Sequence, residues 1–246
     1  MINYITILVL NFFDYFYKKK LSNFIKKNHL DNINVFLDIG GHKGESINFF
    51  LKNLKIKNIY SFEASPVNFA ELKKQLPRFI NKFDKTNIYI ENIALGAEVK
   101  KDILKQFNES SSSTFSDINE NSSYFKKKHR FLNRKKKETF YSNIETNVMP
   151  LYQYLNNKKI DNIDFLKIDT EGYELNILKG LRDNIRNIKI IFFEHHYDNM
   201  VKKNYRFGDI HSLLINNKFK KIYKSKMPFR KTFEYMYINE SFKKNG

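Results

Sequence analysis

The chain contains no cysteine in its 246 residues. Without thiols it can form neither a disulfide framework nor a thiolate metal site, and it cannot use a cysteine nucleophile. The absence therefore excludes small disulfide-stapled folds and cysteine-dependent enzymes. It leaves the redox compartment open, and a cytoplasmic protein is our expectation.

Long apolar runs are also missing. The most apolar stretch, MINYITILVLNFFDYFYKKK, is interrupted by Asn11 and Asp14, and lysines begin at Lys18. A spanning helix needs about 20 consecutive apolar residues, and a secretory signal places its basic residues before the apolar ones. We therefore expect neither here. The apolar positions recur at helical spacing, which predicts an amphipathic helix over residues 1–30 that packs on its own domain or lies on a membrane surface.

Acidic residues are few compared with basic ones. Lysine and arginine number 44 against 26 for aspartate and glutamate, so the net charge is +18. Such a chain attracts nucleic acid, anionic substrates and anionic membranes, although a general drift in composition explains the charge more simply. The densest stretch, residues 126–137, has eight lysines or arginines in twelve positions. Like charges keep such a segment solvated unless an anionic partner neutralises it.

Strand and helix patterns alternate along most of the chain, which is typical of an α/β domain. We expect one catalytic-type α/β domain over residues 31–246, with a basic insertion at about 97–149. A near-continuous apolar strand over Asn187–His196 predicts a buried parallel sheet. Residues 219–226 and 232–239 alternate as in a terminal hairpin. The predicted fold is a mostly parallel, twisted, Rossmann-like sheet flanked by helices, with a C-terminal antiparallel hairpin.

Glycine is scarce, yet three of the eight glycines fall in one turn, DIGGHKG, as Gly40, Gly41 and Gly44. Glycines there allow a sharp turn, and the helix that follows directs its first amides at a ligand. The dinucleotide fingerprint has glycine where this turn has Asp38, so a dehydrogenase fits poorly. A carboxylate suits a cationic ligand such as S-adenosylmethionine, which carries a sulfonium and an ammonium group.

Ligands of open parallel sheets bind beyond the carboxyl ends of the strands, so residues at those ends are the candidates for binding and catalysis. Glu63 ends the second strand, 19 residues after Gly44, where a ribose-binding carboxylate is expected. The candidate cofactor residues are therefore Asp38, Gly40, Gly41, Gly44, Glu63, Asn92 and Ala94.

The fourth and fifth strands supply the candidate catalytic residues Asp169, Glu171 and His196. If S-adenosylmethionine is the ligand and a hydroxyl is its methyl acceptor, one of these groups must accept the hydroxyl proton. Asp169 has the better position and a histidine the better-matched pKa, so we favour Asp169 first. Asp169, Glu194 and a histidine would also suit Mg²⁺, but the sequence does not assign a metal.

Several of these motifs resemble those of the FkbM-type S-adenosylmethionine-dependent methyltransferases. The resemblance covers about residues 35–215 and is carried by DIGGHKGES, FEASP, NIALG, SSSST and, most specifically, LKIDTEGYELNILKG. It implies a class I methyltransferase fold, S-adenosylmethionine as cofactor, and methylation of a hydroxyl on a sugar, glycan or natural product. The basic insertion and basic tail depart from the family pattern.

Three other functions remain as alternatives. The net charge favours an RNA methyltransferase, but no N-P-P-Y or D-P-P-Y turn follows the fourth strand, and nucleic acid is the less favoured partner. A non-enzymatic polyanion- or membrane-binding protein would not need the strand-end carboxylates, and a nicotinamide oxidoreductase would need a different glycine order. Our expected partners are a small-molecule or glycan acceptor and, peripherally, the anionic inner membrane surface.

Overall fold

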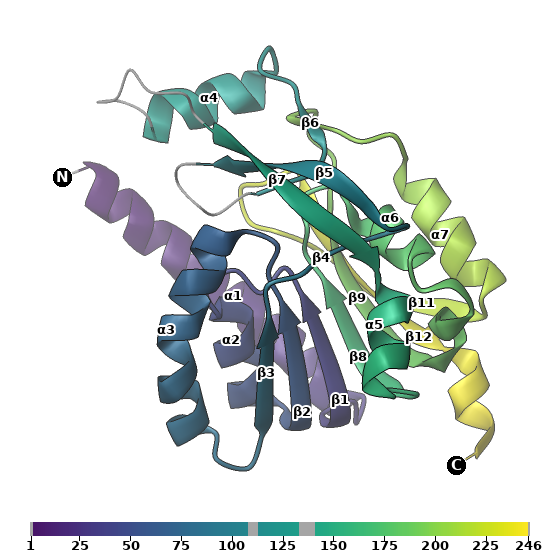
Figure 1. Cartoon of the computed structure of the whole chain (residues 1–246). Coiled ribbons are helices and arrows are strands. Elements are labelled where there is room, and N and C mark those ends of the chain that lie inside the picture. The colour runs from purple at the N-terminus through teal and green to yellow at the C-terminus, as the bar shows by residue number, and fades with distance from the viewer. Residues whose placement is uncertain (1, 108–112, 133–140, 246) are drawn as a thin grey trace.

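A twisted, mostly parallel sheet forms the centre of the computed structural model, which describes residues 2–107, 113–132 and 141–245. Side chains are described for residues 13–107, 113–127 and 141–242. Within these residues, seven strands form the sheet in the order β11-β12-β9-β8-β1-β2-β3 (Figure 1). Their bounds are β1 Asn32–Ile39, β2 Lys55–Phe62, β3 Asn87–Glu91, β8 Ile163–Ile168, β9 Ile188–His196, β11 Phe219–Lys226 and β12 Thr232–Asn239.

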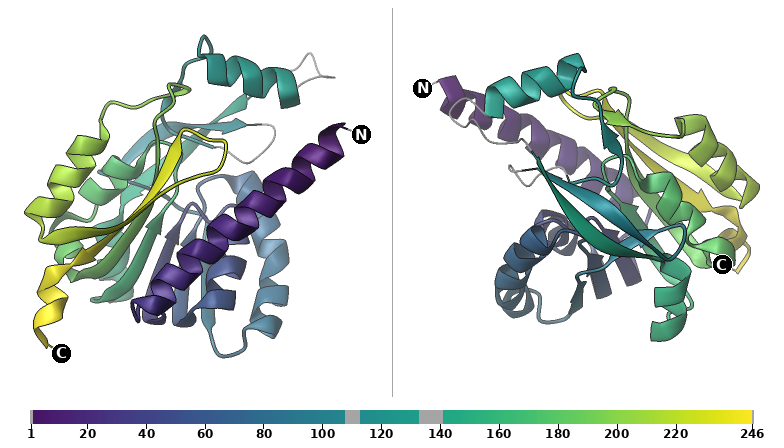
Figure 2. Two further views of the ribbon diagram at one scale, coloured as in Figure 1. Left: turned by 180° about the vertical axis from the view of Figure 1, so that it is seen from behind. Right: turned by 45° about the horizontal axis from the view of Figure 1, so that its top comes forward.

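Helices cover both faces of this sheet and enclose two apolar cores (Figure 2). One face carries α1 Ile2–Lys27, α2 Glu45–Asn53 and α3 Pro66–Lys82. The other carries α5 Leu151–Lys158, α6 Glu174–Lys179, the short helix η1 Arg182–Asn187 and α7 Phe207–Asn216. A further short helix, η2 Glu240–Asn245, follows β12. This is the three-layered α/β arrangement predicted from the alternation of patterns.

The strand β9 shows why a near-continuous apolar run lies inside the sheet. Side chains alternate across a strand, so Ile190 and Phe192 pack toward α1 and α2 while Ile191 and Phe193 pack toward α6 and α7. A strand buried on both faces needs apolar residues at both sets of positions. The prediction made from this run is confirmed.

The predicted C-terminal hairpin is also present. Its second strand, β12, lies antiparallel between β9 and β11 and is the antiparallel member of an otherwise parallel region. This position brings Glu234 directly opposite Glu194 and Thr232 opposite His196. Both pairs contribute polar groups to the same edge of the sheet.

The β-branched pattern of residues 87–95 predicts a single strand, and this prediction is wrong because the chain turns after Glu91. The Asn92 side chain donates to the Glu63 carbonyl at 2.7 Å, and the chain then leaves the main sheet. A small second sheet follows in the described residues, with β4 Ala94–Gly96, β7 Tyr141–Pro150 and β5 Lys100–Phe107 in that order. The segment at 97–149 therefore contributes paired strands, together with β6 Asp117–Ile118, which pairs with β10 Val201–Lys202, and α4 Ser123–Leu132.

The predicted N-terminal helix is present as α1, and its second half packs on the domain. Tyr17, Leu21 and Ile25 are buried, whereas Phe13 and Phe16 are about half exposed. The first part of the helix extends beyond the sheet (Figure 2). No helix in the described part of the chain has the length and apolar content to cross a bilayer. Of the basic stretch at 126–137, the side chains of Lys126 and Lys127 are exposed on α4, and those of 128–137 lie outside the described residues.

Candidate active site

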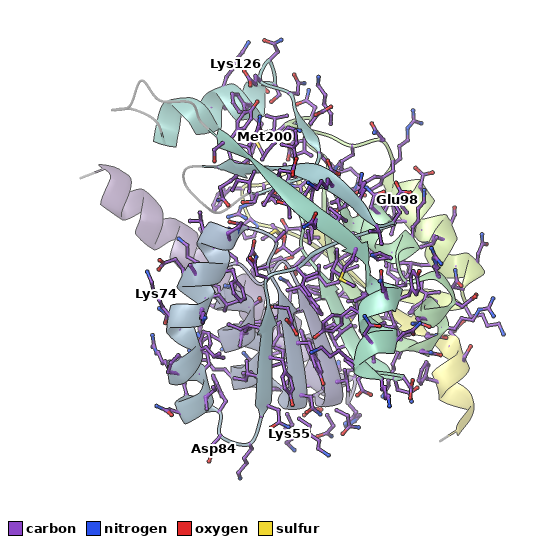
Figure 3. All side chains as sticks on the ribbon, in the orientation of Figure 1. Lys55, Lys74, Asp84, Glu98, Lys126 and Met200 are labelled. Atoms are coloured by element: carbon purple, nitrogen blue, oxygen red, sulfur yellow. The ribbon has the colours of Figure 1, made fainter. Side chains whose placement is uncertain are left out.

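A cavity lies where the carboxyl ends of β1, β2 and β8 meet the small sheet. In Figure 3, Lys126 marks this end of the molecule, and Lys55 marks the opposite end, where β2 begins. The cavity holds about 640 Å³, including space open to solvent, and its walls include Gly40, Glu63, Asp169 and Glu171. Four of the residues predicted to form the site therefore line one cavity.

The turn after β1 needs glycine because of its backbone. Gly40 has φ +82°, and a Cβ there would lie 1.9 Å from the Asp169 carbonyl oxygen. Gly44, with φ +95°, begins α2 in the left-handed region. The Gly40 and Gly41 amides donate to the Phe62 carbonyl at 2.9 and 3.0 Å, so the turn is tied to the end of β2.

Asp38 lies beneath this turn and outside the lining of the cavity. Its Oδ2 accepts hydrogen bonds from Ser46 Oγ at 2.7 Å and Ser61 Oγ at 3.1 Å, and its Oδ1 lies 2.9 Å from Lys167 Nζ. The carboxylate is fully buried. The negative charge that we had assigned to a cationic ligand is therefore paired with a lysine of the chain itself.

Lys167 is a site residue that the sequence did not predict. It lies in the apolar strand β8, directly opposite Asp38 on β1, and it also donates to the Gly40 carbonyl at 3.1 Å. Burial alone would lower the pKa of Lys167, but the Asp38 and Asp169 carboxylates raise it above its ordinary value. A lone lysine within an apolar strand was the available signal, because a buried charge needs a partner.

Glu63 occupies the predicted position at the end of β2 and lines the cavity. Its Oε2 accepts from the His42 amide at 2.7 Å and its Oε1 from the Ser65 amide at 2.8 Å. Burial raises the pKa of Glu63 although these hydrogen bonds oppose the shift. Each oxygen keeps a second lone pair, so the carboxylate can still accept a hydrogen bond from a ligand.

Three of the other predicted cofactor residues surround the cavity without lining it. Asn92 is held under Glu63 by its hydrogen bond to the Glu63 carbonyl. Ala94 is buried at the start of β4, while its neighbours Ile93 and Leu95 line the cavity. Gly44 lies at the N-terminus of α2, on the far side of the turn.

Asp169 lies between the first cavity and a second one. The second cavity, of about 1140 Å³ including open space, lies between α1, α2 and the loop that joins β11 to β12. Within the described residues, Gly40, His42 and Asp169 line both cavities. The Asp169 side chain is 37% exposed, and its Oδ2 lies 3.7 Å from Lys167 Nζ.

His196 is surrounded by carboxylates. Its Nε2 lies 3.1 Å from Glu171 Oε2 and 3.3 Å from Glu194 Oε1. Both contacts are ion pairs, and neither has the geometry of a hydrogen bond. Burial alone would lower the pKa of His196, but Glu171, a hydrogen bond with Asp198, and Glu194 raise it to about 10. The imidazole is therefore protonated on both ring nitrogens at neutral pH and cannot accept a further proton.

His195 faces the opposite side of the sheet, as the alternation of strand residues requires. Its ring packs against the rings of Tyr197 and Phe207, at centroid distances of 4.9 and 5.7 Å. Burial, with Lys203 nearby, lowers the pKa of His195 to about 3. This histidine is neutral and belongs to the core.

Comparison with known protein families shows which family the chain belongs to. The FkbM methyltransferase domain matches residues 38–221, which include the turn at Gly40 and every residue that lines the first cavity. The chain belongs to the FkbM methyltransferase family. No curated protein matches the sequence significantly.

Two solved structures show the same fold as this FkbM domain at low sequence identity. Methyltransferase FkbM from Methylobacillus flagellatus KT has 15% identity and a TM-score of 0.54, over 85% of this chain and 44% of that one. The chain thus spans less than half of that protein. The magnesium protoporphyrin IX methyltransferase ChlM from Synechocystis PCC 6803, solved with bound SAH, has 8% identity and a TM-score of 0.51, over 94% of this chain and 85% of that one. The predicted class I methyltransferase fold is confirmed.

The suggested Mg²⁺ site has no counterpart in the described part of this FkbM domain. Within those residues, no group of three or more histidine or carboxylate side chains is arranged to hold a metal ion. Glu194 and Glu171 instead surround the His196 ring.

Proposed function

We propose that the chain is an S-adenosylmethionine-dependent O-methyltransferase that acts on a hydroxyl of a sugar, glycan or natural-product acceptor. The observation that carries the proposal is the position of Asp169, in an FkbM methyltransferase domain, between two cavities at the carboxyl edge of the sheet. One cavity would take the cofactor and the other the acceptor. A carboxylate between the two cavities would lie close to both the cofactor and the acceptor.

The residues of the first cavity fit the cofactor. Glu63 offers a buried carboxylate for the ribose, and the apolar side chains of Ile93, Leu95 and Phe115 offer a surface for the adenine. Ser113 Oγ is buried in the same wall without a hydrogen-bond partner in the described residues. A buried hydroxyl without a partner is costly, and a bound ligand would satisfy it.

When bound, S-adenosylmethionine supplies a methyl group that its sulfonium sulfur has already activated. The chain must then align the acceptor oxygen and remove its proton. Asp169 would accept the hydroxyl proton while the oxygen–methyl bond forms and the sulfur–methyl bond breaks. The protonated His196 would hold Glu171 in place rather than act as the base.

Calorimetry with the purified chain tests the cofactor assignment. We expect S-adenosylmethionine and its demethylated product S-adenosyl-homocysteine to bind, and NAD not to bind, because Asp38 and the glycine order do not suit a pyrophosphate. Binding of NAD with no binding of either methyl-transfer ligand would refute the proposed function.

We also propose that α1 brings the domain to an anionic membrane surface. Phe13 and Phe16 are exposed on the helix, and Phe13 meets the exposed Phe229 of the β11–β12 loop edge to face at 5.0 Å. Lys18 and Lys19 follow on the same helix and are exposed. Exposed aromatic rings next to lysines are the composition of an interfacial helix.

Flotation with vesicles is the measurement for this membrane proposal. We expect binding to phosphatidylglycerol vesicles but not to phosphatidylcholine vesicles, weakening once salt shortens the Debye length to about 8 Å. Joint replacement of Phe13 and Phe16 by serine should reduce binding, and the same change at exposed Val67 and Ile80 on α3 should not. A chain that shifts RNA but does not float would favour the nucleic-acid alternative.

A further inference from the structure

Two helices and a loop form the walls of the second cavity. Tyr17 and Lys18 of α1 form one side, Phe49 of α2 another, and Arg230 of the β11–β12 loop closes a third. Figure 2 shows α1 crossing this face of the sheet. The floor is the polar end of the sheet itself, where β8, β9 and β12 contribute charged side chains.

The lining of this cavity has more acidic than basic side chains, unlike the chain as a whole. Among the described side chains that line it, five are carboxylates and three are lysine or arginine: Asp14, Glu45, Asp169, Glu194, Glu234, Lys18, Lys167 and Arg230. In the chain as a whole, basic residues outnumber acidic ones by 44 to 26. Lys167 is moreover paired with Asp38, which lies outside the lining. A phosphate or carboxylate entering this cavity would therefore meet more acidic than basic side chains.

Two of the acidic residues lie directly opposite each other on neighbouring strands. Glu194 on β9 and Glu234 on β12 are directly opposed in the antiparallel register, an arrangement that is destabilising for like charges. Glu234 Oε2 is shielded from solvent and has no hydrogen-bond partner in the described residues. Burial raises the pKa of Glu234 to about 7, and burial with Asp169 raises that of Glu194 well above its usual range. The pair is therefore partly protonated at neutral pH. A hydroxyl or ammonium donor that reaches Glu234 Oε2 would stabilise the ionised form, whereas an anion would oppose it.

We propose that the second cavity binds a sugar unit of the acceptor that carries no phosphate, with Glu234 and Glu194 accepting hydrogen bonds from its hydroxyl or ammonium groups. This inference rests on the proposed function and adds the chemistry of its acceptor. The half-buried Phe49 ring offers an apolar surface for one face of the sugar ring. Hydroxyl and ammonium groups are donors that a carboxylate pair can satisfy, whereas a phosphate has only acceptors at neutral pH.

Saturation-transfer NMR on the chain saturated with S-adenosyl-homocysteine tests the acceptor site. The probes are methyl glucoside, glucosamine and phosphorylated glucose. We expect the first two to bind, and phosphorylated glucose to bind about tenfold more weakly or not at all. Glu234→Gln and Glu194→Gln, which keep the side-chain shape, should each weaken methyl glucoside binding about tenfold and reduce the discrimination against phosphate.

The control is Glu240→Gln, an exposed carboxylate beyond the end of β12, which should leave all three affinities unchanged. Melting temperatures show whether each variant is folded. Equal or tighter binding of phosphorylated glucose, no binding of either unphosphorylated sugar, or unchanged affinities in both cavity variants would each refute the inference. Cofactor calorimetry on the same samples separates the two proposals, because a chain that binds S-adenosylmethionine but shows no sugar preference refutes the acceptor site alone.

Discussion

Replacement of Asp169 by asparagine is expected to lower methyl transfer by about 100- to 10,000-fold, the usual contribution of a general base, while the fold and cofactor binding persist. Asparagine keeps the shape of the side chain but removes its negative charge. The Asp169 amide that donates to the Ile39 carbonyl at 3.0 Å is part of the backbone and is not changed. The measurement is S-adenosyl-homocysteine formation at saturating cofactor, with the acceptor that the sugar screen identifies.

A matched control is available on the same strand. Asp164 lies at the amino-terminal end of β8, where its Oδ2 accepts from the Asn34 and Val35 amides at 2.8 and 3.1 Å. Asp164→Asn should lower the melting temperature without lowering turnover in the folded protein. If Asp169→Asn weakens cofactor binding with no separate loss of turnover, Asp169 holds the cofactor and is not the base.

The rival bases can be separated in the same assay. Glu171→Gln and His196→Gln each disturb the carboxylate cluster, but His196 is protonated at neutral pH because of its pKa of about 10. We therefore expect a smaller loss of turnover in His196→Gln than in Asp169→Asn. The opposite order would make the His196 cluster the site of proton transfer.

Local patterns in the sequence predicted the parts of this fold that depend on neighbouring residues. One example is the pair Ser65 and Pro66, a capping serine followed by a proline that suits the first helical position, which predicts a helix start. In the structure Ser65 Oγ accepts from the Asn68 amide at 3.1 Å, and α3 begins at Pro66. The turn at Gly40 and the terminal hairpin are others. Each is a short-range feature whose physical cause lies within a few residues.

The features that the sequence did not predict depend on which strands become neighbours. Asp38 and Lys167 pair because β1 and β8 lie side by side, although 129 positions separate the two residues. Glu194 meets Glu234 for the same reason, through the insertion of β12 beside β9. Neither pairing has a local signature. The sequence therefore suggested that the Asp38 carboxylate faces a cationic ligand, whereas in the structure its charge is paired with Lys167.

The strongest expected effect on the cofactor is at Glu63. We expect Glu63→Ala to weaken S-adenosylmethionine binding by about tenfold or more, which corresponds to about 1.4 kcal/mol per factor of ten. Two causes act together. The ribose loses a carboxylate acceptor, and the His42 and Ser65 amides lose the group that holds the turn and the start of α3 against the cavity.

Two further variants distinguish these causes. Glu63→Gln retains an oxygen that can accept from one amide, so it should recover much of the melting temperature lost in Glu63→Ala while still binding the cofactor more weakly than the wild type. Glu91→Ala removes a carboxylate from the neighbouring strand end, where its Oε1 accepts from the Tyr154 hydroxyl at 2.9 Å outside the cavity lining, and should leave cofactor affinity unchanged. Calorimetry gives the affinities and thermal melts the stabilities. If Glu63→Ala binds S-adenosylmethionine as the wild type does, the carboxylate only braces the turn, and the ribose must be held elsewhere in the first cavity.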